Sequence, residues 1–267
     1  MTYAAPMFRH ALVRPPGARF AAGLTTSGLG APDLVQAREQ HARYCEALER
    51  CGLALRRLAL TRLSPGTAYP DSTFVEDCAV LVPGLAVLAR PGAPSRRGEV
   101  AAIRKVLGEF FPESAEITPP GTLDGGDVCQ AGSMFFVGVS ERTNEKGARQ
   151  LARVLTRRRY AATLVDIRGL PGMLHLKSGL AYLGDGRLVA TEALAGRDVF
   201  AGYEVVGVEP GEGYAANCVR VNDHVLVAAG FPKLEATLLR LGYPVIALEV
   251  SEFRKMDGGL SCLSLRF

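Results

Sequence analysis

Apolar positions recur with a period near 3.6 in several segments of this chain, which predicts amphipathic helices. The clearest covers residues 34–51, between Asp33, a suitable N-cap, and Gly52, a suitable stop. The same combination of periodicity and end signals predicts helices over residues 99–108, 145–159 and 233–241.

Short runs rich in β-branched and aromatic residues lie between these helices and predict strands. Turn residues at 184–186 and 222–223 predict that two pairs of strands form hairpins. The order strand, strand, helix, strand repeats along the chain and predicts an α/β fold. The predicted strands cover residues 74–82, 85–89, 134–139, 180–184, 187–191, 217–221 and 225–229.

Polar residues interrupt these apolar segments at similar intervals. Glu76, Asp124, His175, Asn217 and Cys262 are separated by 48, 51, 42 and 45 residues. Spacing of this kind indicates a repeated unit, and five units of about 50 residues would account for the whole chain. We therefore expect one domain over residues 1–267 in which these polar positions converge on a common axis.

Composition excludes several classes of protein. Of the residues, 48% are hydrophobic and 22% charged, and there is no long apolar run, so we expect no membrane span. The N-terminal segment lacks the apolar core of a secretory signal. A net charge of +4 with scattered arginines argues against a nucleic-acid partner. The six dispersed cysteines lack disulfide or zinc spacing, which favours free thiols in the cytoplasm.

The C-terminal residues resemble a strand that must be held in place. Under period-two alternation, Leu263, Leu265 and Phe267 fall on one side, and Cys262 falls on the other. Cys262 is then either a nucleophile or a small buried hydrophobic residue, as most free cysteines are. The other five cysteines fall within predicted helices and strands and are expected to be structural.

His175 and several acids are the other candidates for chemistry. A histidine suits a general acid that protonates a leaving amine, although a buried structural role is the alternative. Glu76 and Asp77 interrupt an apolar segment, where carboxylates are rarely buried without a cation. Asp124 and Asp127 flank two glycines, in either a ligand-binding turn or an ordinary one. Acids without clustered histidine or cysteine suit an organic cation better than a transition metal.

Arginines follow two of the predicted strands. Residues 90–97 and 140–144 each place arginine in a loop at the start of a helix, where it suits a carboxylate, although a surface role is the alternative. A ligand with a guanidinium at one end and a carboxylate at the other would use both the acids and the arginines. Arginine-like amino acids fit that description.

These motifs together resemble the dimethylarginine dimethylaminohydrolase family of the pentein superfamily. The similarity runs over almost the whole chain, and it implies a five-bladed pentein α/β propeller of ββαβ units with pseudo-five-fold symmetry. It also implies hydrolysis of methylated arginines to citrulline through a covalent cysteine intermediate, without metal or cofactor. The segments that carry it are FVEDCAVL, RPGAPSRR, LDGGD, SERTN, LHLKSGLAYL, NCVRVNDHVLV and DGGLSCLSLRF.

The resemblance also implies a role for individual residues. Cys262 would be the nucleophile, His175 the acid and base, and Asp124 and Asp77 the ligands of the guanidinium. Arg96 and Arg142 would bind the substrate carboxylate. We expect the remaining contacts from a lid within residues 17–30, represented by Phe20, and from Asp71, Phe74, Glu76, Met256 and Asp257.

Three alternatives share part of this pattern. An arginine deiminase would act on free arginine, but it carries a helical insertion for which this chain has no room. An amidinotransferase would use an amine instead of water, in a longer chain. A non-catalytic propeller would have no need for the combined cysteine, histidine and acids. We expect a methylarginine as the small-molecule partner, and the sequence allows a homodimer.

Overall fold

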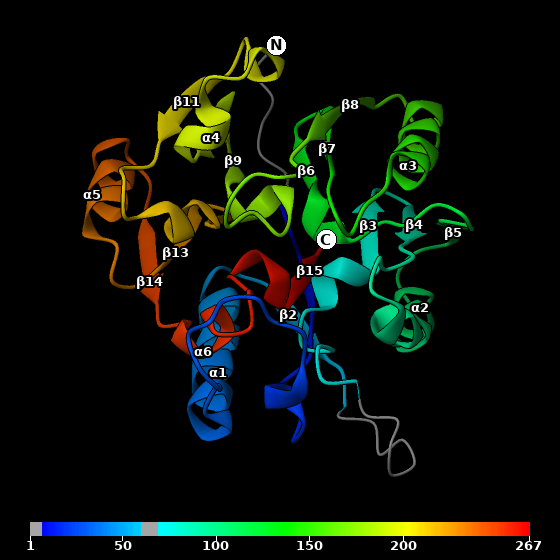
Figure 1. The fold of residues 1–267 in the computed structure, drawn as a ribbon, viewed down its shortest axis with the longest axis horizontal. Coiled ribbons are helices and arrows are strands. Elements are labelled where there is room, and N and C mark those ends of the chain that lie inside the picture. Colours follow the sequence, from blue (N-terminus) through cyan, green and yellow to red (C-terminus); the bar gives the residue numbers. More distant parts are fainter. Residues whose placement is uncertain (1–6, 60–68) are drawn as a thin grey trace.

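Five three-stranded sheets surround a central axis in the computed structural model, which describes residues 7–59 and 69–267 (Figure 1). In each sheet the middle strand pairs antiparallel with one neighbour and parallel with the other. The strand orders are β15-β1-β2, β3-β4-β5, β6-β7-β8, β9-β10-β11 and β12-β13-β14. This arrangement confirms the predicted five-bladed α/β propeller.

The strands are short, as expected for blades that meet near an axis. Both predicted hairpins, β9–β10 and β12–β13, are confirmed. The strands are β1 His10–Val13, β2 Ala54–Arg57, β3 Ala79–Val82, β4 Leu85–Leu88, β5 Glu113–Glu116, β6 Val128–Ala131, β7 Met134–Val139, β8 Ala161–Asp166, β9 Leu180–Gly184, β10 Arg187–Ala190, β11 Glu204–Gly207, β12 Val219–Val221, β13 His224–Ala228, β14 Val245–Leu248 and β15 Ser264–Arg266.

The longer helices lie at the periphery of the molecule, each beside the sheet whose strands it connects (Figure 1). All four predicted helices are confirmed, within one or two residues at their ends. Asp33 caps α1 by accepting a hydrogen bond from the amide of Gln36. The helices are α1 Leu34–Arg50, α2 Val100–Leu107, α3 Glu145–Arg157, α4 Glu192–Ala195, α5 Pro232–Arg240 and α6 Ser251–Arg254.

The first blade is completed by both ends of the described chain. The C-terminal strand β15 pairs antiparallel with β1, and the amides of Arg9 and His10 donate to the carbonyl of Phe267. This pairing explains why the C-terminal segment is ordered, since a strand needs a neighbour for its backbone groups. It is consistent with one domain over residues 1–267, which stays a prediction.

Apolar side chains fill the spaces between neighbouring sheets. In β7, Phe135 packs toward the second sheet, whereas Phe136 packs toward the fourth. Because successive strand residues face opposite neighbours, both faces are buried and the strands are apolar without alternation. Among the described residues, no helix has the length and apolar character needed to cross a membrane.

Two segments differ from their predictions in ways that affect the site, and the first lies over residues 74–82. Residues 74–82 were expected to form a continuous strand, but a 3₁₀ turn covers Val75–Cys78 and β3 begins only at Ala79. The acids Glu76 and Asp77 therefore lie on a tight turn, where consecutive side chains point in different directions.

Candidate active site

Each blade carries a short 3₁₀ turn directly before, or one or two residues before, its strand nearest the axis. The five polar residues that recur along the sequence all lie on or beside these turns. Asp124 and His175 precede their turns, Asn217 follows its turn, and Glu76 and Cys262 lie within theirs. The turns are Val75–Cys78, Gly125–Asp127, Leu176–Ser178, Gly213–Ala216 and Ser261–Leu263.

Cys262 shows how the tertiary structure changed the expected local geometry. It was predicted on a strand, but its amide donates to the carbonyl of Gly259 and closes the turn Ser261–Leu263. The strand β15 starts after it, at Ser264. The prediction that strand alternation aims the thiol is therefore wrong. The turn, not a strand, determines which way the thiol points.

Hydrogen bonds from side chains connect each turn to the next, so that the five turns form a closed ring. All of these bonds measure between 2.7 and 3.0 Å. They join Asp77 to Gly126, Asp127 to Leu176, Asn217 to Lys177, Asn217 to Ser261, and Ser261 to Glu76. The ring holds functional side chains from distant parts of the sequence in one place.

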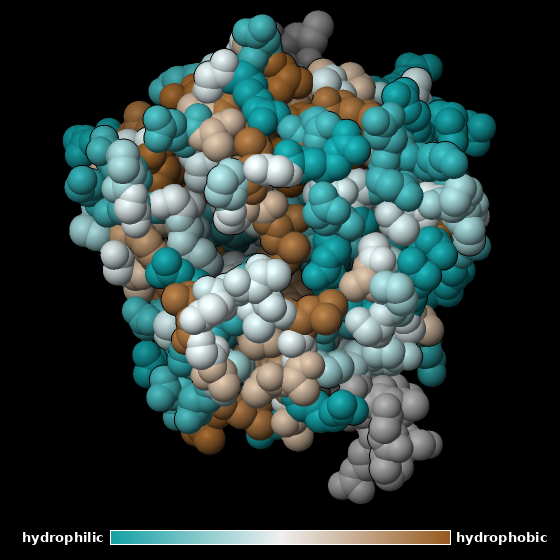
Figure 2. All heavy atoms as spheres, in the orientation of Figure 1, coloured by the Kyte–Doolittle hydropathy of each residue, from teal (hydrophilic) through white to brown (hydrophobic). Residues whose placement is uncertain are grey.

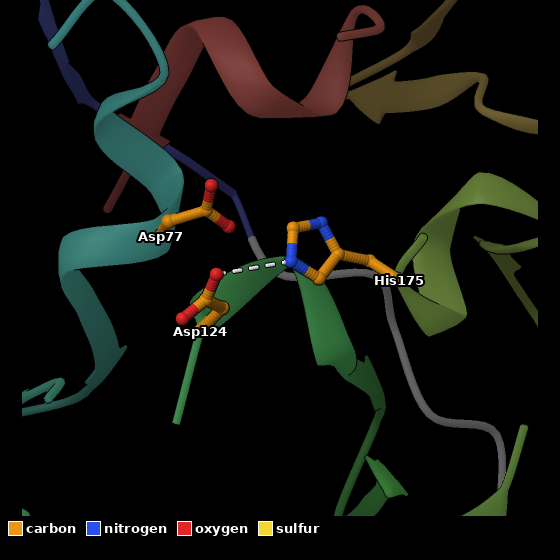
Figure 3. A group of neighbouring side chains, drawn as sticks. All are labelled: Asp77, Asp124 and His175. Atoms are coloured by element: carbon orange, nitrogen blue, oxygen red, sulfur yellow. Dashed lines mark hydrogen bonds and ion pairs between the residues drawn. The ribbon is translucent and has the colours of Figure 1, made fainter. Parts of the chain in front are cut away.

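Asp77, Asp124 and His175 form the centre of the site (Figure 3). Asp124 Oδ2 lies 3.1 Å from His175 Nε2, and Asp124 Oδ1 accepts a 2.8 Å hydrogen bond from the amide of Gly92. Gly126 is required here, since a Cβ atom on it would lie 2.7 Å from His175 Nδ1 and 2.8 Å from Asp77 Oδ1. The close approach of three blades thus depends on this glycine.

The buried acids determine the protonation of His175. Burial alone would lower the pKa of His175, but the charges of Asp77, Asp127 and Asp124 raise it to about 9. Burial would likewise raise the pKa of Asp77, but His175 and Arg96 hold it at about 2. At neutral pH the site therefore contains an imidazolium beside a carboxylate, which can give a proton to a leaving group.

The Cys262 thiol lines the same cavity as His175 and Asp77. Burial, together with the charges of Glu76 and Asp77, raises the pKa of this thiol to about 12, and Lys177 opposes the shift. The thiol is thus protonated at neutral pH in the empty site. A cation placed between it and the carboxylates would favour the thiolate.

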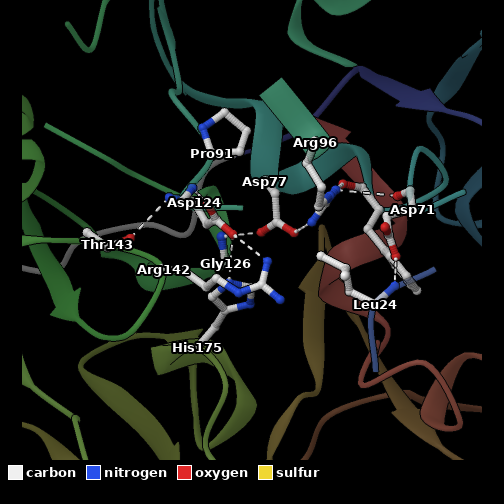
Figure 4. A network of polar contacts seen from close by, with 12 residues as sticks. Leu24, Asp71, Asp77, Pro91, Arg96, Asp124, Gly126, Arg142, Thr143 and His175 are labelled. Carbon is white, nitrogen blue, oxygen red and sulfur yellow. Dashed lines mark hydrogen bonds and ion pairs between the residues drawn. The ribbon is translucent and has the colours of Figure 1, made fainter. Parts of the chain in front are cut away.

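The two arginines differ in how much of their hydrogen-bonding capacity is free (Figure 4). Arg96 is buried, and its guanidinium donates to Asp77 Oδ2 at 2.5 Å, to both oxygens of Glu99 and to the carbonyl of Phe74. Arg142 is more open, and its nearest carboxylate oxygen, on Asp124, is 4.0 Å away. Arg142 is therefore the better placed of the two to bind an additional carboxylate.

Hydrogen bonds hold residues 23–27 beside the cavity. The amide of Leu24 donates to Asp71 Oδ1 at 2.9 Å, and the amide of Thr26 donates to Asp257 Oδ2 at 2.5 Å. The cavity beneath measures about 20 Å³, which is room for about one water molecule. A cavity of this volume is too small for an amino acid.

Most of the predicted site residues meet at this cavity. The lining residues are Leu24, Asp71, Phe74, Asp77, Arg96, Arg142, Leu174, His175, Met256, Asp257, Gly258 and Cys262. Phe20 is absent from this group, since it is buried against Phe74 and Phe253 in the core. Of the segment 17–30, Leu24 lines the cavity instead, and the Gly-rich sequence has no periodicity that would identify it. The space-filling view shows a hollow beside pale and apolar residues near the middle of this face (Figure 2).

Glu76 faces away from this cavity. Its Oε1 accepts from Lys177 at 2.6 Å and from Arg266 at 3.0 Å, and its Oε2 accepts from Ser261. Glu76 and Lys177 line a second cavity, of about 180 Å³, and do not line the one that contains Cys262. The placement gives no support for a direct contact between Glu76 and substrate.

Asp77, Asp124 and His175 also offer three possible ligand atoms within 4.8 Å of one another. Two of the three groups, however, already pair with each other, and Asp77 pairs with Arg96. All six cysteines are buried and without disulfides in the part of the chain that the structure describes. The arrangement is better suited to a planar cation, which can donate several hydrogen bonds to carboxylates at once.

Comparisons with known proteins agree with this geometry. A family model described as arginine deiminase matches residues 105–200. An N(G),N(G)-dimethylarginine dimethylaminohydrolase from Pseudomonas aeruginosa is 41% identical over 262 residues, which cover 98% of this chain and 100% of that protein. A protein of the same description from Streptomyces coelicolor is 34% identical, with 97% of this chain and 96% of that protein covered.

Solved structures are also similar. A cysteine-to-serine variant of the Pseudomonas aeruginosa enzyme, complexed with citrulline, has a TM-score of 0.92 at 40% identity and covers 98% of this chain and 100% of that one. The N-terminal domain of an arginine dihydrolase has a TM-score of 0.83 at 21% identity, with 98% and 97% covered. At that identity the second similarity concerns the fold alone.

Proposed function

Since the chain belongs to the N(G),N(G)-dimethylarginine dimethylaminohydrolase family, we propose that it hydrolyses Nω-methylated arginines to citrulline and a methylamine. The observation that carries this proposal is the single cavity shared by Cys262, His175 and Asp77, with Asp124 hydrogen-bonded to the imidazole. Nucleophile, acid and the two cation-binding carboxylates come from four different blades and meet at or beside this cavity.

Asp77 and Asp124 hold the substrate guanidinium in this proposal, while Arg142 binds the carboxylate at the other end. Arg96 supports Asp77, because its donors are already filled by Asp77, Glu99 and a backbone carbonyl. Asp71 and Asp257 lie at the rim, where they contact the substrate amino end together with Leu24. Fixing the substrate in this way can contribute roughly 7–11 kcal/mol of the barrier reduction in well-oriented reactions.

The first half of the reaction forms a covalent intermediate. The bound cation favours loss of the Cys262 proton to solvent, and the thiolate attacks the guanidinium carbon, so that a C–S bond forms. The C–N bond to the methylated nitrogen then breaks, and His175 gives its proton to the departing amine. General acid catalysis of this kind is worth about 10²–10⁴-fold.

The second half releases citrulline. His175, now neutral, takes a proton from a water molecule as the water oxygen attacks the thiouronium carbon. The C–S bond breaks and Cys262 leaves as the thiolate, while the remaining proton on the former water oxygen is lost to solvent as the carbonyl of citrulline forms. Every step uses groups of this chain, the substrate and water, and the proposal includes no metal or cofactor. A cytoplasmic location and a homodimer remain part of it as predictions.

The test is to incubate the protein separately with asymmetric dimethylarginine, monomethylarginine and arginine and to measure citrulline. We expect turnover of the methylated substrates and none by Cys262→Ser, with the unfolding temperature of that variant unchanged. Cys129→Ser is a matched control, since Cys129 is a buried thiol that does not line the catalytic cavity. Faster citrulline release from arginine than from methylated forms would favour a deiminase instead.

A further inference from the structure

Asp127 is a buried carboxylate that the proposed reaction does not use. It is fully inaccessible to solvent, and both of its oxygens are hydrogen-bonded. Oδ1 accepts from the amide of Leu176 at 2.9 Å, and Oδ2 accepts from Ser140 Oγ at 2.7 Å. A carboxylate is rarely buried without a reason, because its desolvation is costly.

Leu176 and Ser140 lead from Asp127 to two parts of the active site, and the Thr143 side chain is a further hydrogen-bond partner. Leu176 directly follows His175 in the chain and begins the turn that His175 caps. Ser140 Oγ in turn accepts from the amides of Arg142 and Thr143, each at 3.0 Å. One carboxylate therefore connects the backbone beside the acid–base residue to the loop that carries the free arginine.

Neighbouring atoms pack closely around the Asp127 carboxylate. A Cβ atom on Gly138 would lie 2.8 Å from Asp127 Oδ1 and 3.0 Å from Leu176 Cβ. None of the ion pairs among the described residues joins Asp127 to an arginine or a lysine, so His175 is the cation that its charge acts upon. Burial raises the pKa of Asp127 to about 6, so the group is ionised at neutral pH.

We propose that Asp127 is a positioning residue that fixes the His175 imidazole relative to the Arg142 loop and keeps the imidazole protonated. The proposal rests on the proposed function only for the roles of His175 and Arg142. Asparagine cannot replace the carboxylate, because the Leu176 N–H and the Ser140 O–H reach different oxygens of Asp127, and an amide has only one oxygen. Ser140 Oγ already accepts two amides, so an NH₂ group there would compete with them.

Several charged groups besides Asp127 face His175 and must be kept constant in a test. Asp77, backed by Arg96, faces it from the turn before β3. Asp124 hydrogen-bonds the ring directly, and Arg142 and the Cys262 thiol share the cavity. Removal of the Asp127 charge alone should lower the pKa of His175, because that charge is one of those that raise it.

The experiment compares Asp127→Asn with Asp223→Asn, an isosteric change at an exposed acid of the β12–β13 hairpin. The His175 imidazole is titrated by NMR in protein labelled at its four histidines, with His175→Gln for assignment. Steady-state rates with dimethylarginine are measured across pH. We expect the His175 midpoint to fall and the basic limb of kcat to move to lower pH by the same amount, so that the loss of kcat is largest above pH 9, roughly tenfold if the midpoint falls by one pH unit.

A role in folding alone would lower the unfolding temperature and leave the His175 midpoint in place, and that result would overturn the proposal. Ser140→Ala provides a second test if Asp127→Asn does not fold. It keeps the charge but frees the Arg142 loop, so KM should rise several-fold with a smaller shift of the His175 midpoint. Unchanged KM in Ser140→Ala would also overturn the proposal. If the parent protein lacks turnover, the proposed function fails, while the NMR titration still tests Asp127.

Discussion

Glu76 provides the sharpest test of the site, since sequence similarity and structure assign it different roles. The resemblance places it among the substrate contacts, whereas the structure directs it toward Lys177, Arg266 and Ser261. The informative perturbation is Glu76→Gln, which keeps the size of the side chain and removes its charge.

The expected loss of stability follows from the burial of the three side chains. The side chains of Glu76, Lys177 and Arg266 are 5%, 15% and 13% exposed, so the two cations would lose their shared counter-ion in a poorly solvated place. Breaking a buried pair by neutralising one partner costs about 3–5 kcal/mol. For a chain of this size, 1 kcal/mol corresponds to about 2–4 °C, so we expect the unfolding temperature to fall by roughly 10 °C.

The same substitution should also change the nucleophile. Glu76 is the first charged group after burial itself that raises the pKa of Cys262, so its removal should lower that pKa. The rate of alkylation of Cys262 by iodoacetamide, followed against pH, reports the change, with Cys262→Ser as the blank. The alkylation midpoint should move to lower pH in the empty enzyme.

Kinetics decide between the two roles. If Glu76 only ties the turns together, KM for dimethylarginine should change little at a temperature well below unfolding. A KM raised tenfold or more with an unaltered unfolding temperature would refute our reasoning and restore Glu76 as a substrate contact. Gln130→Glu is a useful control, because it adds a charge to the same second cavity without touching the Glu76 pairs.

Three further predictions test other parts of the site. Arg142→Ala should raise KM for dimethylarginine roughly 10–100-fold, which corresponds to the loss of a charged hydrogen bond. Arg96→Met should mainly lower the unfolding temperature. Equal effects of the two substitutions would contradict the different pairing of the two arginines. His175 has a folded pKa of about 9 against an ordinary 6.5, so its contribution to stability is complete below pH 6.5 and is lost as pH rises through 9. The difference in urea unfolding free energy between parent and His175→Gln should shrink over that range, and a constant difference would argue against the shift. Gly126→Ala should abolish turnover, because its methyl group would displace His175 or Asp77. The control Gly186→Ala lies at an open hairpin turn with positive φ and should lower only the stability. Full activity of Gly126→Ala would count against the close approach of His175 and Asp77 to Gly126.

The sequence alone determined the repeated pattern of this protein. Helix periodicity with Asp33 as a cap predicted α1 almost to the residue, because capping and amphipathic spacing are local properties. The intervals between Glu76, Asp124, His175, Asn217 and Cys262 predicted convergence on an axis. The resemblance then predicted twelve site residues, and nine of them line one cavity in the structure.

Only the tertiary structure decided where those side chains point. A single 3₁₀ turn has no periodicity of its own, so the segments around Glu76 and Cys262 could not be distinguished from strands. Adjacent residues on such a turn face different cavities, and for this reason Asp77 lines the catalytic cavity while Glu76 does not. Leu24 rather than Phe20 lines the cavity, because the Phe20 ring packs in the core against Phe74 and Phe253. Local sequence determined which residues could take part in the chemistry, and packing between the blades determined where their side chains point.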